Sequence, residues 1–204
     1  MYIKLFIIII SITLFSSCIR ERRDIRGMEK FEYLDTDRGY IFYKPDNLPT
    51  NAPLVFVLHG FGGNAEWIKD YSRMNEIADQ NGFAVCYPQG RRVGGNGDTH
   101  WNARLTLSTI DDVGFLSSLA QFLQSEHNLN PNKTFSCGMS NGGFMSYTLA
   151  CEAPSVFKAI ASITGTMSGE SWNTINMSAS AIPSTPILHI HGTQDDIVPI
   201  DGTM

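Results

Sequence analysis

The sequence predicts an α/β fold in which helices cover both faces of a mostly parallel sheet. Continuous apolar runs at 53–60, 83–88 and 133–139 alternate with segments whose apolar residues have helical spacing. Such runs are typical of strands buried on both faces, and strands that alternate with helices form parallel sheets. A length of 204 residues with 43% hydrophobic content suits one domain.

The first half of the chain contains the expected elements in order. Residues 31–44 have the pattern of a β-hairpin around the turn sequence Asp-Thr-Asp-Arg-Gly. After the strand at 53–60, Asn64 is predicted to cap one helix that ends at Gly82, and the strand at 83–88 follows.

The second half repeats the alternation after a long polar, glycine-rich loop at 89–107. Thr109 and Asp112 resemble a capping box, which predicts a helix start there. One face of this helix is apolar and carries Leu116, Leu119, Ala120 and Leu123. The remaining expected elements are a strand at 133–139, a helix at 141–154, and strands at 157–165 and 185–192.

Residues 1–17 have the pattern of an export signal. Lys4 precedes an apolar-rich run at 5–15, which is too short to span a bilayer. A run of this length behind a positive charge at the N-terminus fits the apolar region of such a signal better than a buried core element.

Cys18 ends the sequence Leu-Phe-Ser-Ser-Cys, which resembles the lipobox of bacterial lipoproteins, with Phe15 where leucine is commoner. We therefore expect a cell-envelope or extracellular protein that contacts a membrane through a lipid on Cys18. The charged residues 18–28 are interpreted as a tether, and residues 29–204 as the domain.

The other cysteines, Cys86, Cys137 and Cys151, indicate neither a disulfide framework nor a metal site. An odd number cannot all pair within one chain. Cys86 and Cys137 lie in apolar strand-like runs, which predicts buried free thiols. No cysteine has metal-ligand spacing with a histidine, and the formal net charge of -5 gives no reason to expect a nucleic-acid partner.

The motif with the most specific chemistry is Gly-Met-Ser-Asn-Gly at 138–142. It has the Gly-x-Ser-x-Gly pattern and lies between a predicted strand and a predicted helix. This context is that of a sharp turn that exposes a nucleophilic serine above a sheet. Gly138 and Gly142 are expected because a side chain there would clash with the crossing helix and strand. We therefore predict Ser140 as a nucleophile; an ordinary serine in a glycine-rich turn is the alternative.

The sequence Leu-His-Gly-Phe-Gly-Gly-Asn at 58–64 is predicted to stabilise a developing oxyanion. Its glycines let backbone N–H groups point at the negative oxygen, and the expected donors are the amides of Phe61 and Asn141. His59 precedes the serine and lies in a strand-end turn, so we interpret it as a structural histidine.

The end of a third predicted strand supplies the candidate acid of a Ser-Asp-His triad. Asp195 follows the apolar run that ends at Gly192, and therefore lies past the carboxyl end of a strand, where sites of parallel sheets form. Asp196 competes for the role, but the spacing Asp-x-x-Val-Pro favours Asp195. A turn role for either aspartate is the alternative.

These stretches together resemble the polyhydroxybutyrate depolymerase-type esterases, a family of the α/β-hydrolase superfamily that includes feruloyl and acetylxylan esterases. The matching sequences are PLVFVLHGFGGN, GFAVCYPQG, WN at 101–102, DDVGFL, CGMSNGGFMSYTLACEAPSVFKAIASITG and PILHIHGTQDDIVPIDG. The resemblance implies an α/β-hydrolase fold with Ser140 as nucleophile and Asp195 as acid. It implies acyl esters of plant polysaccharides or polyesters as substrates, and no cofactor. Trp101 is our candidate for an aromatic substrate-binding platform.

A general base is not evident. A serine hydroxyl needs one at neutral pH, and the chain order of this fold places the histidine after the acid, yet no histidine follows Asp195. We therefore expect the last helix-strand unit and the histidine loop to lie outside these 204 residues, the chain to be inactive by itself, and the apolar strand at 186–190 to be an exposed edge.

Three alternatives stay open. His100 or His191 can replace the expected base, because triads are defined by geometry rather than by chain position. A pseudoenzyme that binds glycan or polyester without turnover would also keep the pocket. A thiol enzyme that uses Cys137 is disfavoured, because that residue lies inside a predicted strand.

Overall fold

The computed structural model describes residues 25–92, 97–177 and 184–201 of the chain. The predicted export signal and Cys18 lie outside the described residues. The strands are β1 Glu29–Tyr33, β2 Thr36–Tyr43, β3 Leu54–Leu58, β4 Ala84–Pro88, β5 Arg91–Arg92, β6 Thr99–His100, β7 Thr134–Met139, β8 Ala159–Ile163 and β9 Ile187–Ile190. The helices are α2 Ala65–Ser72, α3 Met74–Asn81, α4 Asp112–Glu126, α5 Asn141–Glu152 and α6 Gly169–Met177.

The main sheet has seven strands in the order β1-β2-β4-β3-β7-β8-β9. The hairpin of β1 and β2 is antiparallel and joins β4 in antiparallel fashion. From β4 to β9 all neighbours are parallel, which confirms the predicted mostly parallel sheet. A short antiparallel ribbon of β5 and β6 lies within the polar loop.

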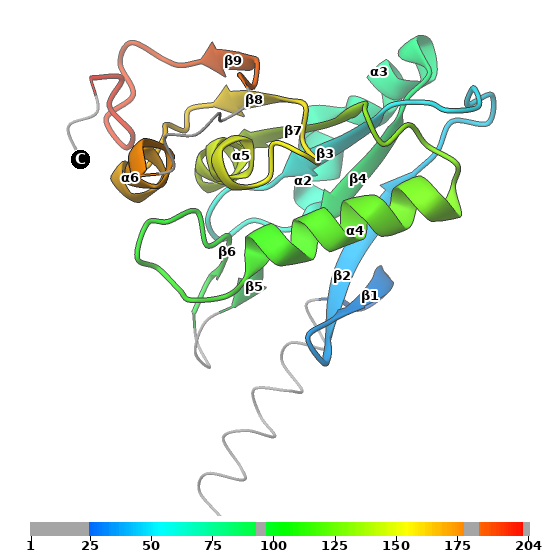
Figure 1. Cartoon of the computed structure of the whole chain (residues 1–204), viewed down its shortest axis with the longest axis horizontal. Helices are drawn as coiled ribbons and strands as arrows, with labels where there is room; N and C mark the ends of the chain where they lie inside the picture. Colours follow the sequence, from blue (N-terminus) through cyan, green and yellow to red (C-terminus); the bar gives the residue numbers. More distant parts are fainter. Residues whose placement is uncertain (1–24, 93–96, 178–183, 202–204) are drawn as a thin grey trace, which may run out of the picture.

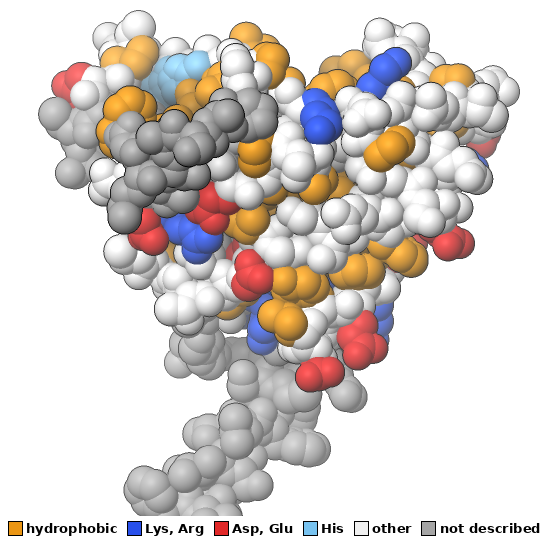
Figure 2. Space-filling model, in the orientation of Figure 1, with side chains coloured by type: hydrophobic (Ala, Val, Ile, Leu, Met, Phe, Trp, Pro, Cys, Tyr) orange, Lys and Arg blue, Asp and Glu red, His pale blue; other side chains and the backbone are white. Residues whose placement is uncertain are grey.

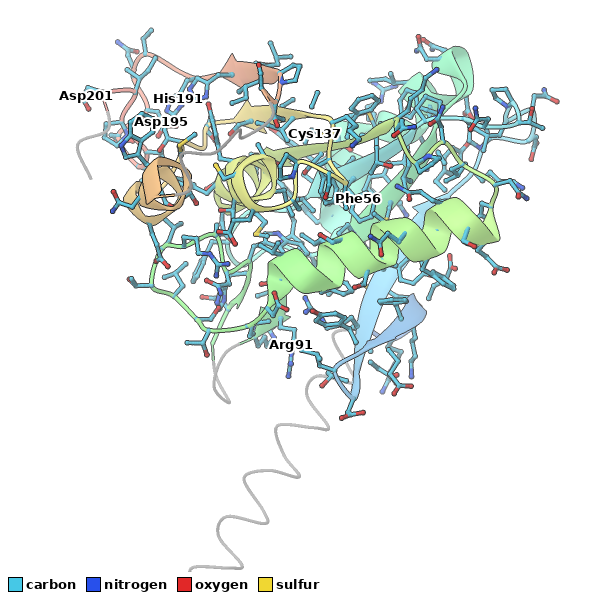
Figure 3. The ribbon with its side chains drawn as sticks, viewed as in Figure 1. Phe56, Arg91, Cys137, His191, Asp195 and Asp201 are labelled. Atoms are coloured by element: carbon cyan, nitrogen blue, oxygen red, sulfur yellow. The ribbon has the colours of Figure 1, made fainter. Side chains whose placement is uncertain are left out.

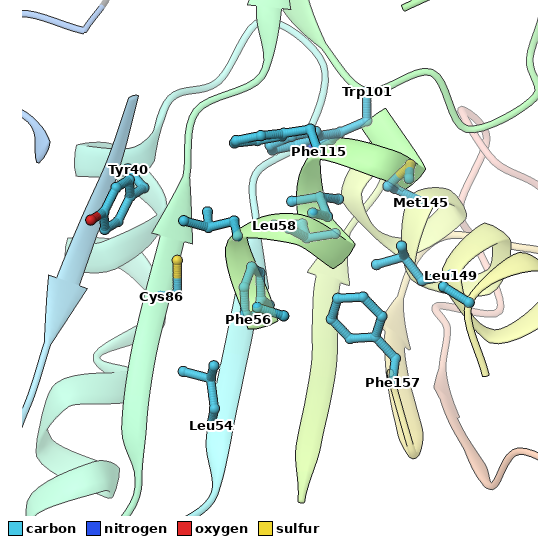
Figure 4. Close-up of a cluster of buried hydrophobic side chains, with 14 of the residues drawn as sticks. Tyr40, Leu54, Phe56, Leu58, Cys86, Trp101, Phe115, Met145, Leu149 and Phe157 are labelled. Atoms are coloured by element: carbon cyan, nitrogen blue, oxygen red, sulfur yellow. The ribbon is translucent and has the colours of Figure 1, made fainter. Parts of the chain in front are cut away.

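Alternate residues of β3 pack into two different cores, which is why the strand is apolar throughout. Phe56 and Leu58 belong to the larger cluster, formed with residues of α4 and α5. Val57 belongs to the smaller cluster, formed with residues of α2 and α3. Figure 1 shows the two groups of helices on opposite sides of the sheet, and Figure 4 shows side chains of the larger core. The predicted apolar face of α4 is fully buried.

Two helix boundaries differ from the prediction. The helix expected from Asn64 to Gly82 is interrupted at Arg73, whose φ of 51° is left-handed and separates α2 from α3. Asn64 does cap α2 by accepting a hydrogen bond from Trp67 N, and Gly82 does end α3. The predicted capping box at Thr109 is wrong, because Asp111 caps α4 through Gly114 N.

The strand β9 forms one edge of the described sheet and is exposed, as predicted. Ile187, Leu188 and Ile190 are 44%, 59% and 51% exposed. Figure 2 shows histidine side chains beside hydrophobic ones at the end of the molecule that carries β9. No helix among the described residues has the length and apolar character needed to cross a bilayer.

Candidate active site

Ser140 lies in a strained turn between β7 and α5. Its φ of 52° and ψ of -121° are a backbone conformation that residues other than glycine rarely adopt. The turn is held on both sides: Ser140 N donates to Ile163 O over 2.8 Å, and Phe144 N donates to Ser140 O over 3.0 Å. The serine remains partly exposed. This is the strand-turn-helix geometry that the sequence predicted.

Close packing explains the two glycines of the motif. A Cβ at Gly138 would lie 2.3 Å from the carbonyl group of Gly142, and a Cβ at Gly142 would lie 2.3 Å from Leu58 O. The clashes with helix and strand that the sequence predicted are therefore confirmed. Gly165 adds a third close approach, since its Cβ would lie 2.7 Å from Ser140 O.

The loop after β3 lies directly against this turn. A Cβ at Gly60 would be 3.5 Å from Ser140 Cβ, so the two glycine-rich motifs meet. Gly63 N donates to Gly60 O over 3.1 Å, a turn hydrogen bond that does not use the Phe61 amide. The amide of Asn141 lies in the first turn of α5, where backbone N–H groups lack intrahelical acceptors and the helix dipole favours negative charge.

His59 is a structural histidine, as predicted. Its ring is fully buried, Nδ1 donates to Gly60 O over 2.7 Å, and Nε2 accepts from Gly90 N over 3.0 Å. Burial lowers the pKa of His59 from 6.5 to about 4. The neutral ring thus joins the loop after β3 to the loop after β4.

Trp101 is not an exposed platform, and this prediction is wrong. Its side chain is fully buried and packs among the residues of the larger core (Figure 4). An exposed aromatic ring in the loop after β3 is instead that of Phe61, which is 53% exposed and stacks on His100 with ring centroids 5.8 Å apart.

Asp195 lies in a turn after β9. Its Oδ1 accepts hydrogen bonds from Ile197 N and Val198 N over 3.0 and 2.9 Å. These bonds, that of Val198 first, hold the pKa of Asp195 below its usual value. Its Oδ2 is 3.7 Å from Nε2 of His191, and Figure 3 shows the two side chains side by side. The competing Asp196 is exposed.

All five histidines are described, and none has a hydrogen bond to Ser140. His191 lies near the acid, but its Nε2 donates to Val198 O over 2.6 Å and its ring is buried. His189 pairs with Tyr147, and His127 stacks on Phe42. His100 donates from Nδ1 to Asp98 O over 2.9 Å. Its buried Nε2, like Nδ1 of His191, has no partner among the described residues.

The thiols do not offer a second nucleophile. Among the described residues Cys86, Cys137 and Cys151 form no disulfide. The predicted buried free thiol is confirmed for Cys86, whereas Cys137 is free but partly exposed. Burial raises the pKa of Cys137 to about 12, so its thiolate is rare at neutral pH. Within the described ranges no group of three or more histidine, cysteine or acidic side chains is arranged to hold a metal ion.

Comparisons with known proteins identify the family and the fold of the chain. A family model described as Esterase PHB depolymerase matches residues 39–200. The Putative esterase NocK of Nocardia uniformis subsp. tsuyamanensis is 33% identical over 162 residues, which are 76% of this chain and 43% of that protein. Acetylxylan esterase A of Talaromyces purpureogenus is 31% identical over 153 residues, which are 71% and 40% of the two chains.

A solved structure shows the same fold. The acetyl xylan esterase from Aspergillus awamori superposes with a TM-score of 0.69 at 20% identity, over 86% of this chain and 76% of that one. The chain spans less than half the length of the two sequence relatives, NocK and Acetylxylan esterase A. Because the family model covers most of its residues, the chain belongs to the Esterase PHB depolymerase family.

Proposed function

We propose that this chain carries the nucleophile and the acid of a serine carboxylic-ester hydrolase. The observation that carries the proposal is the backbone of Ser140, whose φ of 52° is maintained between a buried strand and a helix against glycine contacts on both sides. Strain of this kind costs about 1–3 kcal/mol and persists where the surrounding structure enforces it, often at functional sites.

In the proposed reaction Ser140 Oγ attacks an ester carbonyl while a base takes its proton. The carbonyl oxygen becomes negative, and the amides of Phe61 and Asn141 donate hydrogen bonds to it. The bond to the alcohol breaks, the alcohol leaves with a proton from the base, and an acyl-serine ester remains. Water, activated by the same base, then releases the acid and restores the serine.

We propose that the base is a histidine outside these 204 residues, oriented by Asp195. The hydrogen bonds within the turn use only Oδ1 of Asp195. Its Oδ2 can therefore accept a hydrogen bond from the histidine. All five described histidines form hydrogen bonds or ring stacks with groups other than Ser140. His100 and His191 are the alternative bases, because each keeps one ring nitrogen, Nε2 and Nδ1 respectively, without a partner among the described residues.

The proposed substrates are acyl esters of plant polysaccharides or hydroxyalkanoate polyesters. The proposal rests on the family and on relatives named acetylxylan esterase and feruloyl esterase, which include the Probable feruloyl esterase C of Aspergillus flavus, 27% identical over 194 residues.

The test is labelling of the full-length gene product with a fluorophosphonate probe. We expect labelling of wild type, no labelling of Ser140→Ala, and at least a tenfold slower rate for Asp195→Ala; equal labelling of wild type and Ser140→Ala would refute the proposal. Retained labelling of both His100→Gln and His191→Gln would support an outside base, and its loss in one variant would assign the role to that histidine. Saturable polysaccharide binding without labelling would favour a non-catalytic binding protein.

We also propose that the protein is exported and anchored through Cys18. The support is the sequence pattern of residues 1–18. Metabolic labelling with radioactive palmitate should mark wild type but not Cys18→Ser, and equal labelling of both would contradict the anchor.

A further inference from the structure

We propose that the Asn141 side chain and Trp101 form a clamp that positions both oxyanion donors relative to Ser140. The inference rests on the proposed function, because it assigns a role in the same site. It concerns side chains that do not themselves touch substrate, so Trp101 is a positioning residue. Asn141 has two roles: its backbone N–H faces substrate, and its side-chain amide belongs to the clamp.

The clamp begins with a reciprocal pair of hydrogen bonds. Trp101 N donates to Asn141 Oδ1 over 2.7 Å, and Asn141 Nδ2 donates to Trp101 O over 3.2 Å. Both residues are buried, at 0% and 4% exposed. The buried side-chain amide of Asn141 accepts from the backbone N–H of Trp101 and donates to its backbone carbonyl, so its orientation is fixed. The position of Asn141, the first residue of α5, is fixed with it.

The same tryptophan holds the other donor segment. Its indole Nε1 donates to His59 O over 3.0 Å, and its ring lies 5.0 Å from the His59 ring. His59 in turn donates to Gly60 O, the carbonyl immediately before the Phe61 amide. Trp101 therefore connects the segment that carries Phe61 with the residue that carries the second donor, although these lie 80 positions apart.

The clamp is itself fixed to the core. Asn102 N donates to Asp112 Oδ2 over 2.8 Å, and Asn102 Nδ2 donates to Ile110 O over 2.7 Å. Asp112 forms an ion pair with Arg38 over 2.7 Å, in which both side chains are at most 2% exposed. A buried pair of this kind is costly to break, so it provides a rigid support for the tryptophan backbone.

A clamp of this type should act on the transition state more than on substrate binding. The oxyanion forms only during the reaction, and the spacing of its two donors decides how well both reach it. A misplacement of about 1 Å can cost about a hundredfold in rate. Loss of the clamp should therefore lower kcat and leave KM nearly unchanged.

The experiment measures kcat and KM on p-nitrophenyl acetate with the full-length gene product. We expect kcat of Asn141→Ala to fall about 10–100-fold with KM within about threefold. Trp101→Phe, which keeps the ring packing but loses the indole N–H, should lower kcat about 3–10-fold. The double variant should lose less than the product of the two effects, because both changes release the same clamp.

Ser146→Ala is the matched control. Ser146 is buried in the same helix, and its hydrogen bonds go to Gly142 O and Ser136 Oγ rather than to Asn141 or Trp101. The kcat of Ser146→Ala should therefore stay within about twofold while its thermal stability falls. A kcat for Asn141→Ala within about twofold of wild type, or a rise of KM alone, would overturn the clamp. If Asn141→Ala does not fold, Trp101→Phe decides in the same way.

These outcomes are separate from failure of the proposed function. Ser140→Ala, measured alongside, should be inactive whether or not the clamp exists. Full activity of Ser140→Ala would refute the esterase mechanism, and the clamp with it. Inactive Ser140→Ala together with unaffected Asn141→Ala and Trp101→Phe would refute the clamp alone.

Discussion

The candidate site has a serine half, which is Ser140 with its turn between β7 and α5, and an acid half, which is Asp195 with its turn after β9. Different interactions hold the two halves in place. Ser140 follows β7, which pairs with β3 on one side and β8 on the other, and its turn contains close backbone approaches at Gly138, Gly142 and Gly165. Asp195 follows β9, which pairs only with β8 among the described strands and exposes all four of its residues. Tertiary packing thus fixes the serine, whereas the aspartate is fixed by local hydrogen bonds and by one core residue of its turn, Val198.

The first prediction tests the packing of the serine half at its closest contact. Gly142→Ala places a methyl group 2.3 Å from Leu58 O, and neither a strand carbonyl nor a helix start can move away cheaply. We expect a loss of roughly 3 kcal/mol or more in the free energy of unfolding, or no folded protein. Urea denaturation followed by circular dichroism measures it.

Gly169→Ala is the control, because a Cβ there meets no atom within 4 Å at the start of α6. Its stability should be unchanged or slightly higher. If Gly142→Ala were as harmless as Gly169→Ala, the contrast between the two halves would fail.

The second prediction concerns the pH dependence that His59 gives to the serine half. The folded pKa of about 4 lies below the unfolded value of 6.5, so between these values the unfolded chain binds more protons. Stability should therefore be lost as pH falls from 6.5 toward 4, by roughly 3 kcal/mol from this residue, and change little further below.

NMR measures the protonation of His59 separately from that of carboxylates that titrate in the same pH range. The C–H signals of the His59 ring should not shift between pH 8 and pH 5.5. A titration of His59 with a midpoint near 6.5 would mean that the ring is accessible and that the loop between β3 and α2 is open.

The sequence predicted most of the serine half because its signals are local. The apolar run before Ser140, the glycines around it and the cap at Asn64 lie within a few residues of the feature that each determines. The break at Arg73 has no such signal, since a left-handed turn is usually marked by glycine or asparagine.

Non-local partners explain the wrong prediction for Trp101. An aromatic residue in a polar, glycine-rich loop has the pattern of an exposed residue. Its burial depends on Asn141, 40 positions later, and on His59, 42 positions earlier. The predicted helix start at Asp112 is confirmed, but its buried ion pair with Arg38, 74 positions away, has no local signal.

The third prediction uses the strain at Ser140. Glycine adopts a φ of 52° without the steric cost that a Cβ imposes. Ser140→Gly should therefore unfold at higher denaturant than Ser140→Ala, by about 1 kcal/mol, because both lack the hydroxyl and only alanine keeps the strain. Equal stability of the two variants would show that the turn is relaxed, and that packing does not force the serine conformation.

The fourth and smallest effect is expected in the acid half. Asp195→Asn keeps an oxygen for the amides of Ile197 and Val198 but removes the charge that they stabilise. Because the folded pKa of Asp195 is lowered, its contribution is present at neutral pH and is lost as pH falls through that folded pKa. The variant should be slightly less stable than wild type at pH 7 and equal to it in acid.

Asp196→Asn, at the exposed neighbour, should match wild type at both pH values. Thermal unfolding of the three proteins at pH 7 and pH 2.5 measures the difference. A loss for Asp195→Asn as large as that for Gly142→Ala would place the acid turn in the cooperative core. Val198 is the one described residue of this turn in the larger core, and β9 contacts the sheet through one strand with its four residues exposed. We expect instead that the aspartate turn changes locally, while the serine turn stays intact until the whole domain unfolds.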